Sequence, residues 1–180
     1  MVDSLVVSGH TKKEKYESLI PQIKALMEGE KDSIANLSNI LAALKYSMDY
    51  FWIGIYFVKP KGPEAVVKTG TKDTQLVLGL FQGPVACTRI DFGKGVCGKC
   101  WELKKTIIVE DVENFPGHIA CSALTKSEIV LPAFCKDGNV LFVLDVDSVN
   151  LADFDETDQS YLEKIIQIIL ESIDMEVFSK

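Results

Sequence analysis

The spacing of apolar residues changes twice along the chain, and this change constrains the fold more than any other feature. Residues 12–28, 34–48 and 155–178 carry apolar side chains three or four positions apart, which predicts amphipathic helices. Between them, residues 51–58 and 74–81 are rich in aromatic and β-branched side chains, which favours strands. Helices before and after a run of strands, with few strand-helix-strand alternations, predict an α+β fold.

A turn signal predicts two further strands. Residues 128–134 and 140–146 are apolar and are joined by Lys136-Asp137-Gly138-Asn139, whose Asp-Gly pair is typical of a hairpin. We therefore expect an antiparallel sheet flanked by the N- and C-terminal helices. Pro21 falls inside the first helical segment and predicts a kink there, or a break and a restart.

Length, composition and charge exclude several classes of protein. A chain of 180 residues suits one domain over residues 1–180, and 47% hydrophobic with 25% charged residues is close to the globular average. The formal charge of -7 disfavours nucleic acid and anionic membranes as partners. Residues 1–10 lack the pattern of a signal peptide, and the longest apolar stretch is too short for a membrane span. We expect a cytoplasmic protein.

Residues 82–127 form short pieces punctuated by glycines, and four of the five cysteines fall inside this stretch. Such irregular segments often carry function. One interpretation is a structural zinc site with two ligand pairs, Cys97 with Cys100 and His118 with Cys121. Against it, this chain has enough apolar sequence to fold without a metal. The fifth cysteine, Cys135, lies in the apolar hairpin and is interpreted as a core residue.

The other interpretation is a redox centre, which needs a reachable thiolate and a second thiol. Cys121 follows the turn Pro116-Gly117-His118, which can expose it, and His118 could favour its thiolate. Cys87 and Cys97 offer resolving thiols. The Cys97–Cys100 spacing alone is a weak indication of a thioredoxin-type dithiol, because no strand-helix unit surrounds it.

Short motifs spread over most of the chain resemble those of the free methionine-(R)-sulfoxide reductases, which are single-domain GAF-fold enzymes. The motifs are Ala25-Leu26-Met27-Glu28-Gly29-Glu30, Trp52-Ile53-Gly54-Ile55-Tyr56, Leu78-Gly79-Leu80-Phe81-Gln82-Gly83, Ala86-Cys87, Gly93-Lys94-Gly95-Val96-Cys97-Gly98, Asp111-Val112, Gly117-His118-Ile119-Ala120-Cys121, Ser127-Glu128-Ile129-Val130-Leu131-Pro132 and Leu144-Asp145-Val146-Asp147-Ser148. The set is specific to that family, whereas the GAF fold alone would also fit a cyclic-nucleotide or bilin sensor.

The resemblance implies roles for the cysteines. Cys121 matches the cysteine that attacks the sulfoxide, and Cys87 and Cys97 match the two resolving thiols. The substrate is then free methionine-(R)-sulfoxide, reduced through a sulfenic acid and an intramolecular disulfide, with no metal or organic cofactor and with thioredoxin as the reductant. Cys100 stands where the family has a small residue, which leaves open which disulfide ends the cycle. The oligomeric state is open as well, and a homodimer is one candidate.

The resemblance also implies a binding pocket. Trp52 and Tyr56 match the aromatic residues that receive the S-methyl end, and Glu128, Asp145 and Asp147 match carboxylates that hold the ammonium group and assist the sulfoxide oxygen. The chemistry suits these residue types, because a sulfoxide becomes a good electrophile only when its oxygen is protonated. Glu128 is the first candidate for that proton donor. Asp145 and Asp147 alternate along a predicted strand and therefore face the same side.

Two alternatives from other functional classes remain at this point. One is a non-catalytic GAF module that binds a small ligand or senses oxidants through its thiols. A sensor normally carries an output domain, for which 180 residues leave no room. The other is the zinc-stabilised interaction domain described above.

Overall fold

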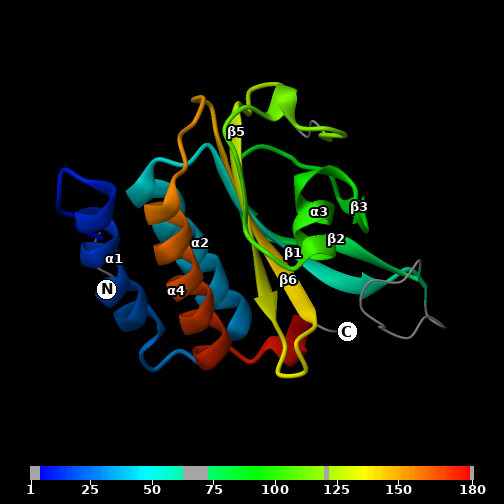
Figure 1. Ribbon diagram of the computed structural model, residues 1–180. Coiled ribbons are helices and arrows are strands. Elements are labelled where there is room, and N and C mark those ends of the chain that lie inside the picture. The colour runs from blue at the N-terminus through cyan, green and yellow to red at the C-terminus, as the bar shows by residue number, and fades with distance from the viewer. Residues whose placement is uncertain (1–4, 63–72, 120–121, 179–180) are drawn as a thin grey trace.

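A six-stranded antiparallel sheet forms the centre of the computed structural model, which describes residues 5–62, 73–119 and 122–178 (Figure 1). The strands lie in the order β3-β2-β1-β6-β5-β4. Their bounds are β1 Trp52–Pro60, β2 Thr74–Gln82, β3 Arg89–Asp91, β4 Ile107–Val109, β5 Ser127–Phe134 and β6 Val140–Ser148. The predicted α+β class, the antiparallel sheet and the hairpin of β5 and β6 are confirmed.

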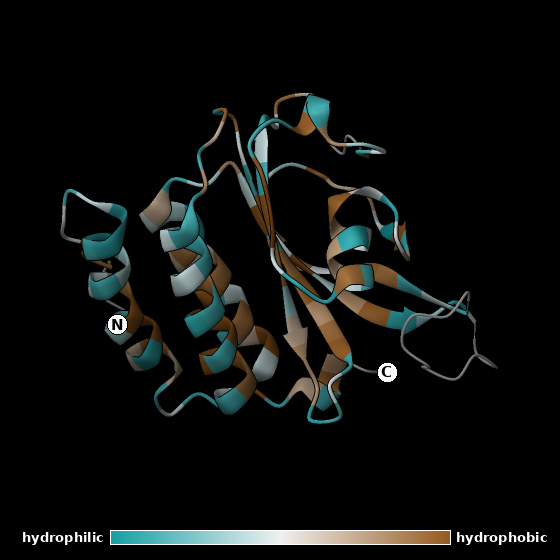
Figure 2. Cartoon of the chain, in the orientation of Figure 1, coloured by the Kyte–Doolittle hydropathy of each residue, from teal (hydrophilic) through white to brown (hydrophobic). Residues whose placement is uncertain are grey.

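Three helices cover one face of the sheet: α1 (Lys12–Met27), α2 (Ser33–Met48) and α4 (Glu156–Ser172) (Figure 1). Helices α2 and α4 contact the strands, and α1 packs against α2 and α4. Their apolar side chains and one face of β1, β5 and β6 form a single buried cluster. Figure 2 shows hydrophobic residues concentrated in the sheet and polar residues on the outer sides of these helices. This layer supplies most of the core.

Helix α3 (Gly95–Leu103) covers part of the opposite face. Val96, Cys100 and Trp101 of this helix pack with Val58 and Val130 of the strands in a second buried cluster. As a result β1 is buried on both faces over its first seven residues. Burial on both faces explains why its sequence is continuously apolar instead of alternating.

The helices begin at capping residues. Thr11 and Glu14 form a capping box at the start of α1, Asp32 caps α2, and Asp155 and Asp158 form a capping box at the start of α4. Carboxylates at these positions also interact favourably with the helix dipole. The acidic residues that open the terminal helix therefore serve the fold.

Two helices differ from the expectation, one in its continuity and one in its end. Helix α1 continues through Pro21, so the break expected as one of two outcomes does not occur, and the kink stays a prediction. The proline removes one backbone hydrogen bond, and burial of the neighbouring Leu19 and Ile23 in the core stabilises the helix across it. The terminal helix ends at Ser172, and a separate 3-10 turn, η2 (Met175–Phe178), follows it.

The stretch at residues 82–127 contains more regular structure than expected. Besides α3 it holds the short strands β3 and β4 and the 3-10 turn η1 (Val112–Asn114). Helix α3 has only nine residues, and two of them, Gly95 and Gly98, are glycines. A pattern this brief is too short to show helical periodicity. None of the helices in the described part of the chain is long and apolar enough to cross a bilayer.

Candidate active site

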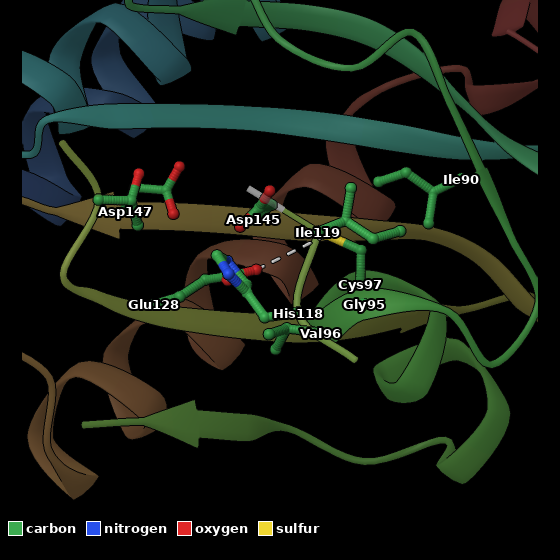
Figure 3. A pocket seen from close by; sticks show the side chains of 10 residues that line it. Ile90, Gly95, Val96, Cys97, His118, Ile119, Glu128, Asp145 and Asp147 are labelled. Atoms are coloured by element: carbon green, nitrogen blue, oxygen red, sulfur yellow. Dashed lines mark hydrogen bonds and ion pairs between the residues drawn. The ribbon is translucent and has the colours of Figure 1, made fainter. Parts of the chain in front are cut away.

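Three carboxyl groups converge on the face of the sheet that α3 covers. Asp145 and Asp147 lie two positions apart on β6, so both side chains leave the same face of the strand, as predicted. Glu128 on β5 pairs directly with Asp147 across the β5–β6 ladder. All three line one pocket (Figure 3).

Cys97 reaches this pocket from the first turn of α3. Its Sγ lies 4.0 Å from Oε1 of Glu128. Cys97, Glu128 and Asp145 each bring one sulfur or oxygen atom within 4.8 Å of the other two. The structure thus brings together four of the residues that the sequence analysis assigned to the site.

Burial and repulsion change the protonation of the carboxyl groups. Burial, followed by the charges of Asp145 and Asp147, raises the pKa of Glu128 well above its usual value. Burial raises the pKa of Asp145 to about 6, although contacts with Cys97 and Glu128 oppose the shift. Burial and the charge of Asp145 raise the pKa of Asp147, and Thr125 opposes this shift. The three carboxyl groups therefore resist full ionisation at neutral pH and titrate as one interacting set.

The pocket lacks a compensating cation. None of its described lining residues is lysine or arginine. Nε2 of His118 lies 3.9 Å from Oε2 of Glu128, but burial lowers the pKa of His118, so His118 adds no positive charge to the pocket at pH 7. Oδ1 of Asp145 is buried without a hydrogen-bond partner. A buried carboxylate oxygen without a partner is costly, and the pocket therefore favours a positively charged ligand.

Cys97 is a thiol and not a thiolate at neutral pH. Burial, followed by the charges of Asp145 and Glu128, raises the pKa of Cys97 well above its usual value. His118 supplies no positive charge that would offset this shift, since its imidazole is neutral. A protonated thiol is a weak nucleophile, so Cys97 suits a second step better than a first attack.

A second pocket shares the two aspartates of β6. Trp52 and Tyr56 of β1 line it, with ring centroids 6.1 Å apart. Nε1 of Trp52 donates a hydrogen bond to the carbonyl of Pro84 at 3.0 Å, and the hydroxyl of Tyr56 donates one to the carbonyl of Cys87 at 3.0 Å. These bonds fix both rings and attach the segment after β2 to the pocket.

Gly54 makes room for the ring of Trp52. A Cβ at this position would lie 2.3 Å from Cη2 of Trp52 and 2.7 Å from Cβ of Phe81. The indole also stacks on Phe81, with 5.6 Å between ring centroids. Gly54 and Phe81 appeared in the sequence only as parts of motifs, and the structure shows that they position the aromatic wall.

The remaining cysteines differ in state and place. Cys87 is disulfide-bonded, whereas three described cysteines are free: Cys97, Cys100 and Cys135. Cys135 is half-buried in the β5–β6 turn and not in the core as expected. The predicted nucleophile, Cys121, lies outside the described residues. Its nearest described neighbours in the sequence, Ile119 and Ser122, line the first and the second pocket.

The described members of the four-ligand zinc set do not form one cluster. Cys97 faces the carboxyl groups, whereas Sγ of Cys100 contacts a backbone carbonyl of β5 at 3.5 Å. Among the described residues, the ligating atoms that gather belong to Cys97, Glu128 and Asp145. Cys97 and Cys100 thus approach different partners although they are three positions apart on one helix.

Several lining residues could not be identified from the sequence. Thr125 lowers the pKa of Asp147 by a side-chain hydrogen bond, and Ile90 and Val96 form apolar lining of the first pocket. Ile90 and Thr125 lie outside every motif, and Val96 appeared only as part of one, because their roles arise only when β3, α3 and the segment before β5 meet on the sheet.

The model of the GAF domain family matches residues 38–174. This range starts within α2, ends after α4 and contains every strand of the sheet. The match therefore covers both pockets and the elements that position them.

Known proteins resemble the chain over nearly its whole length. GAF domain-containing protein A of Dictyostelium discoideum is 51% identical over 169 residues, which cover 94% of this chain and 99% of that protein. The free methionine-R-sulfoxide reductase of Saccharomyces cerevisiae is 39% identical and covers 92% of this chain and 89% of its own. An X-ray structure of the free methionine-R-sulfoxide reductase from Neisseria meningitidis, in complex with its substrate, has a TM-score of 0.83 at 42% identity and covers 97% of each chain.

Sequence identity, coverage and fold lead to the same family, and the resemblance seen in the motifs is confirmed. The chain belongs to the free methionine-(R)-sulfoxide reductase family of GAF-fold oxidoreductases.

Proposed function

We propose that the protein reduces free methionine-(R)-sulfoxide to methionine with its own cysteine thiols, as a single catalytic domain over residues 1–180. One observation carries the proposal: Glu128, Asp145 and Asp147 are gathered beside the thiol of Cys97 in a pocket whose described lining contains no lysine or arginine. The proposal is supported by the relative from Neisseria meningitidis, which is a free methionine-R-sulfoxide reductase solved in complex with its substrate.

In this proposal the ammonium group of the amino acid binds Asp145 and Asp147. The two carboxyl groups leave the same face of β6, and Oδ1 of Asp145 lacks a hydrogen-bond partner that an ammonium would supply. A bound cation also favours the ionised forms of both aspartates. The S-methyl end would lie against Trp52 and Tyr56, since sulfur and methyl groups contact aromatic rings favourably.

Glu128 is the proposed proton donor. Its raised pKa keeps the acid protonated at neutral pH, and a proton given to the sulfoxide oxygen makes the neighbouring sulfur electrophilic. Cys121, which directly precedes the pocket residue Ser122 in the sequence, is the proposed nucleophile. Attack of its sulfur transfers the oxygen. Methionine leaves, its sulfur reduced by two electrons, and Cys121 becomes a sulfenic acid.

Cys87 and Cys97 are the proposed resolving thiols. A thiol sulfur attacks the sulfenic acid, a disulfide forms and the oxygen leaves as water. Cys97 is a free thiol at the pocket, and the carbonyl of Cys87 accepts the hydrogen bond of Tyr56. Thioredoxin, in this proposal, then exchanges its dithiol with the disulfide and returns both cysteines to thiols. A homodimer and a cytoplasmic location stay predictions.

The test is to mix the reduced protein with free L-methionine-R-sulfoxide, with the S epimer and with an N-acetylated R form, and to measure the methionine products. We expect product from the free R form alone, because an N-acetylated substrate has no ammonium for the aspartates and leaves them unpaired. Similar rates on the N-acetylated form would exclude the ammonium pocket. No product from any form would exclude the activity and favour a non-catalytic ligand-binding GAF module.

A further inference from the structure

The first pocket offers more ligating groups than an ammonium ion requires. An ammonium group donates hydrogen bonds and needs only acceptors, which carboxylates provide. The thiol of Cys97 and the imidazole of His118 face the same space as Glu128 and Asp145 (Figure 3). Thiolate, imidazole and carboxylate together are typical ligands of Zn²⁺ and related d-block cations.

The distances are close to those of a metal site. Sγ of Cys97 lies 4.0 Å from Oε1 of Glu128, and both lie within 4.8 Å of a carboxylate oxygen of Asp145. Nε2 of His118 lies 3.9 Å from the other oxygen of Glu128. Ligands of a tetrahedral zinc ion are about 3.3 to 3.8 Å apart, given metal–ligand bonds of about 2.0 to 2.3 Å. Movements of about 1 Å would bring the atoms of Cys97, Glu128 and Asp145 to such separations, whereas His118 contacts only Glu128 and does not belong to this cluster.

One buried oxygen of the cluster has no hydrogen-bond partner, which points to a cation in the pocket. Oδ1 of Asp145 has no hydrogen-bond partner, and the residue is only 7% exposed. Its neighbours are equally enclosed, with Cys97 2% and Glu128 6% exposed. A group buried this deeply without a partner is costly, and a cation in the pocket removes that cost.

We propose that the reduced, substrate-free protein binds one borderline divalent cation, with Zn²⁺ as the best candidate, through Cys97, Glu128 and Asp145. A thiolate ligand favours Zn²⁺ over Mg²⁺ or Ca²⁺, which prefer oxygen. The metal uses Asp145, which the substrate ammonium also needs, so the two exclude each other. Zn²⁺ is then a reversible inhibitor, and this second part rests on the proposed function.

Cobalt provides a spectroscopic test that needs no substrate. Co²⁺ added to the reduced protein should bind in one equivalent and produce a thiolate-to-cobalt charge-transfer absorption. Cys97→Ser should abolish this absorption, and Asp145→Asn should weaken Co²⁺ binding at least about tenfold, since a buried charged ligand contributes more than about 1.4 kcal/mol. Cys100→Ser is the matched control and should bind like the wild type, because Cys100 contacts a backbone carbonyl instead.

The opposite pattern would overturn the site. Absorption that survives in Cys97→Ser, or that disappears in Cys100→Ser, would assign the metal to other ligands. X-ray absorption of the zinc-loaded wild type gives the same answer without a variant: one sulfur among the ligands is expected, and two or more would contradict the proposal.

Turnover measurements then test the inhibition. Zn²⁺ should suppress release of methionine, and a chelator should restore it. Metal binding without inhibition would overturn mutual exclusion. A protein that shows the cobalt spectrum but never releases methionine would contradict the proposed function and leave the metal site supported, so the two failures are distinguishable.

Discussion

Glu128 occupies a position where burial and two neighbouring charges act on its pKa in the same direction. It is buried on β5 and pairs with Asp147 across the ladder. A carboxylic acid that keeps its proton at neutral pH suits protonation of a sulfoxide oxygen. The register of the β5–β6 hairpin therefore raises the pKa of Glu128, because it places the carboxyl groups next to one another.

Replacing Glu128 should lower kcat and remove the decline of kcat at alkaline pH. Glu128→Gln should lower kcat by about 10²- to 10⁴-fold, the usual contribution of a general acid. In the wild type, kcat should decline as the pH rises through the raised pKa of Glu128, because the acid then loses its proton. The variant should lack that alkaline decline when kcat is measured from neutral to alkaline pH.

Asp147→Asn is the control for this assignment. It removes one of the charges that raise the pKa of Glu128, so the alkaline decline of kcat should move to lower pH. KM should rise because one proposed acceptor of the ammonium group is lost. An alkaline decline that stays in place in both variants would assign it to a different group.

The Cys→Ser variants should differ in the amount of methionine that they release in a single turnover. Cys121→Ser should release no methionine, since a neutral hydroxyl does not replace a thiolate. Cys87→Ser and Cys97→Ser should each release about one methionine per chain and then stall with thioredoxin, because the sulfenic acid forms but the reducible disulfide does not. Cys135→Ser, in the β5–β6 turn, should turn over normally. A burst that survives in Cys121→Ser but disappears in Cys87→Ser would make Cys87 the nucleophile.

At the scale of elements, α3 controls where Cys97 lies. The helix contacts β3, β5 and β6, and Gly98 lets it approach the turn after β3 closely. A Cβ at Gly98 would lie 2.5 Å from the carbonyl oxygen of Asp91 and 3.2 Å from the nitrogen of Gly93. Backbone atoms move aside less easily than side chains, so this contact fixes the position of the helix.

Gly98→Ala should therefore move α3 and reduce stability. We expect a loss of about 1 to 3 kcal/mol from overpacking, which exceeds the gain of up to about 1 kcal/mol in helix propensity. Displacement of Cys97 should also slow the resolving step. Gly62→Ala is the matched control, because a Cβ there would have no atom within 4 Å. Equal denaturant midpoints for the two variants would contradict the close approach.

The same elements show what the sequence could predict. Long periodic segments such as α2, and the hairpin marked by Asp137 and Gly138, were found because local patterns determine them. The shared face of Asp145 and Asp147 follows from strand alternation. The convergence of Glu128 and Cys97 on them depends on strand register and on the packing of a nine-residue helix. Local patterns do not determine either. Glu128 was assigned from the family resemblance, whereas Cys97 was a candidate thiol from the cysteine cluster as well as from the resemblance.

At the scale of the whole molecule, the sheet separates two kinds of buried charge. On the helix side, Asp158 is buried but accepts a hydrogen bond from Tyr16 at 2.9 Å and pairs with Lys12. On the other side, Asp145 is equally buried but no lysine or arginine is among the described residues that line its pockets. Burial of the large apolar cluster on the helix side stabilises the fold and offsets the cost of burying this charge. A cationic ligand would lower that cost.

The buried carboxyl groups of the pocket should give the protein an unusual dependence of stability on pH. The pKa of Asp145 rises from 3.8 to about 6 on folding, so the folded state binds more protons than the unfolded state between these values. The free energy of unfolding then falls as the pH rises through this window, by at most about 3 kcal/mol for this group. The raised pKa values of Glu128 and Asp147 extend the decline to higher pH.

We therefore expect the melting temperature of the reduced, ligand-free protein to fall as the pH increases from about 4 to 6 and beyond. Asp145→Asn should flatten the lower part of this decline. Asp137→Asn should not, because Asp137 is an exposed turn residue whose pKa is lowered by hydrogen bonds from Asn139. Saturating methionine should reduce the decline, since its ammonium group pairs with the ionised aspartates. The opposite outcome would be a melting temperature that rises over the same pH range, equally in the wild type and in Asp145→Asn. It would show that the pKa of Asp145 is not raised by folding.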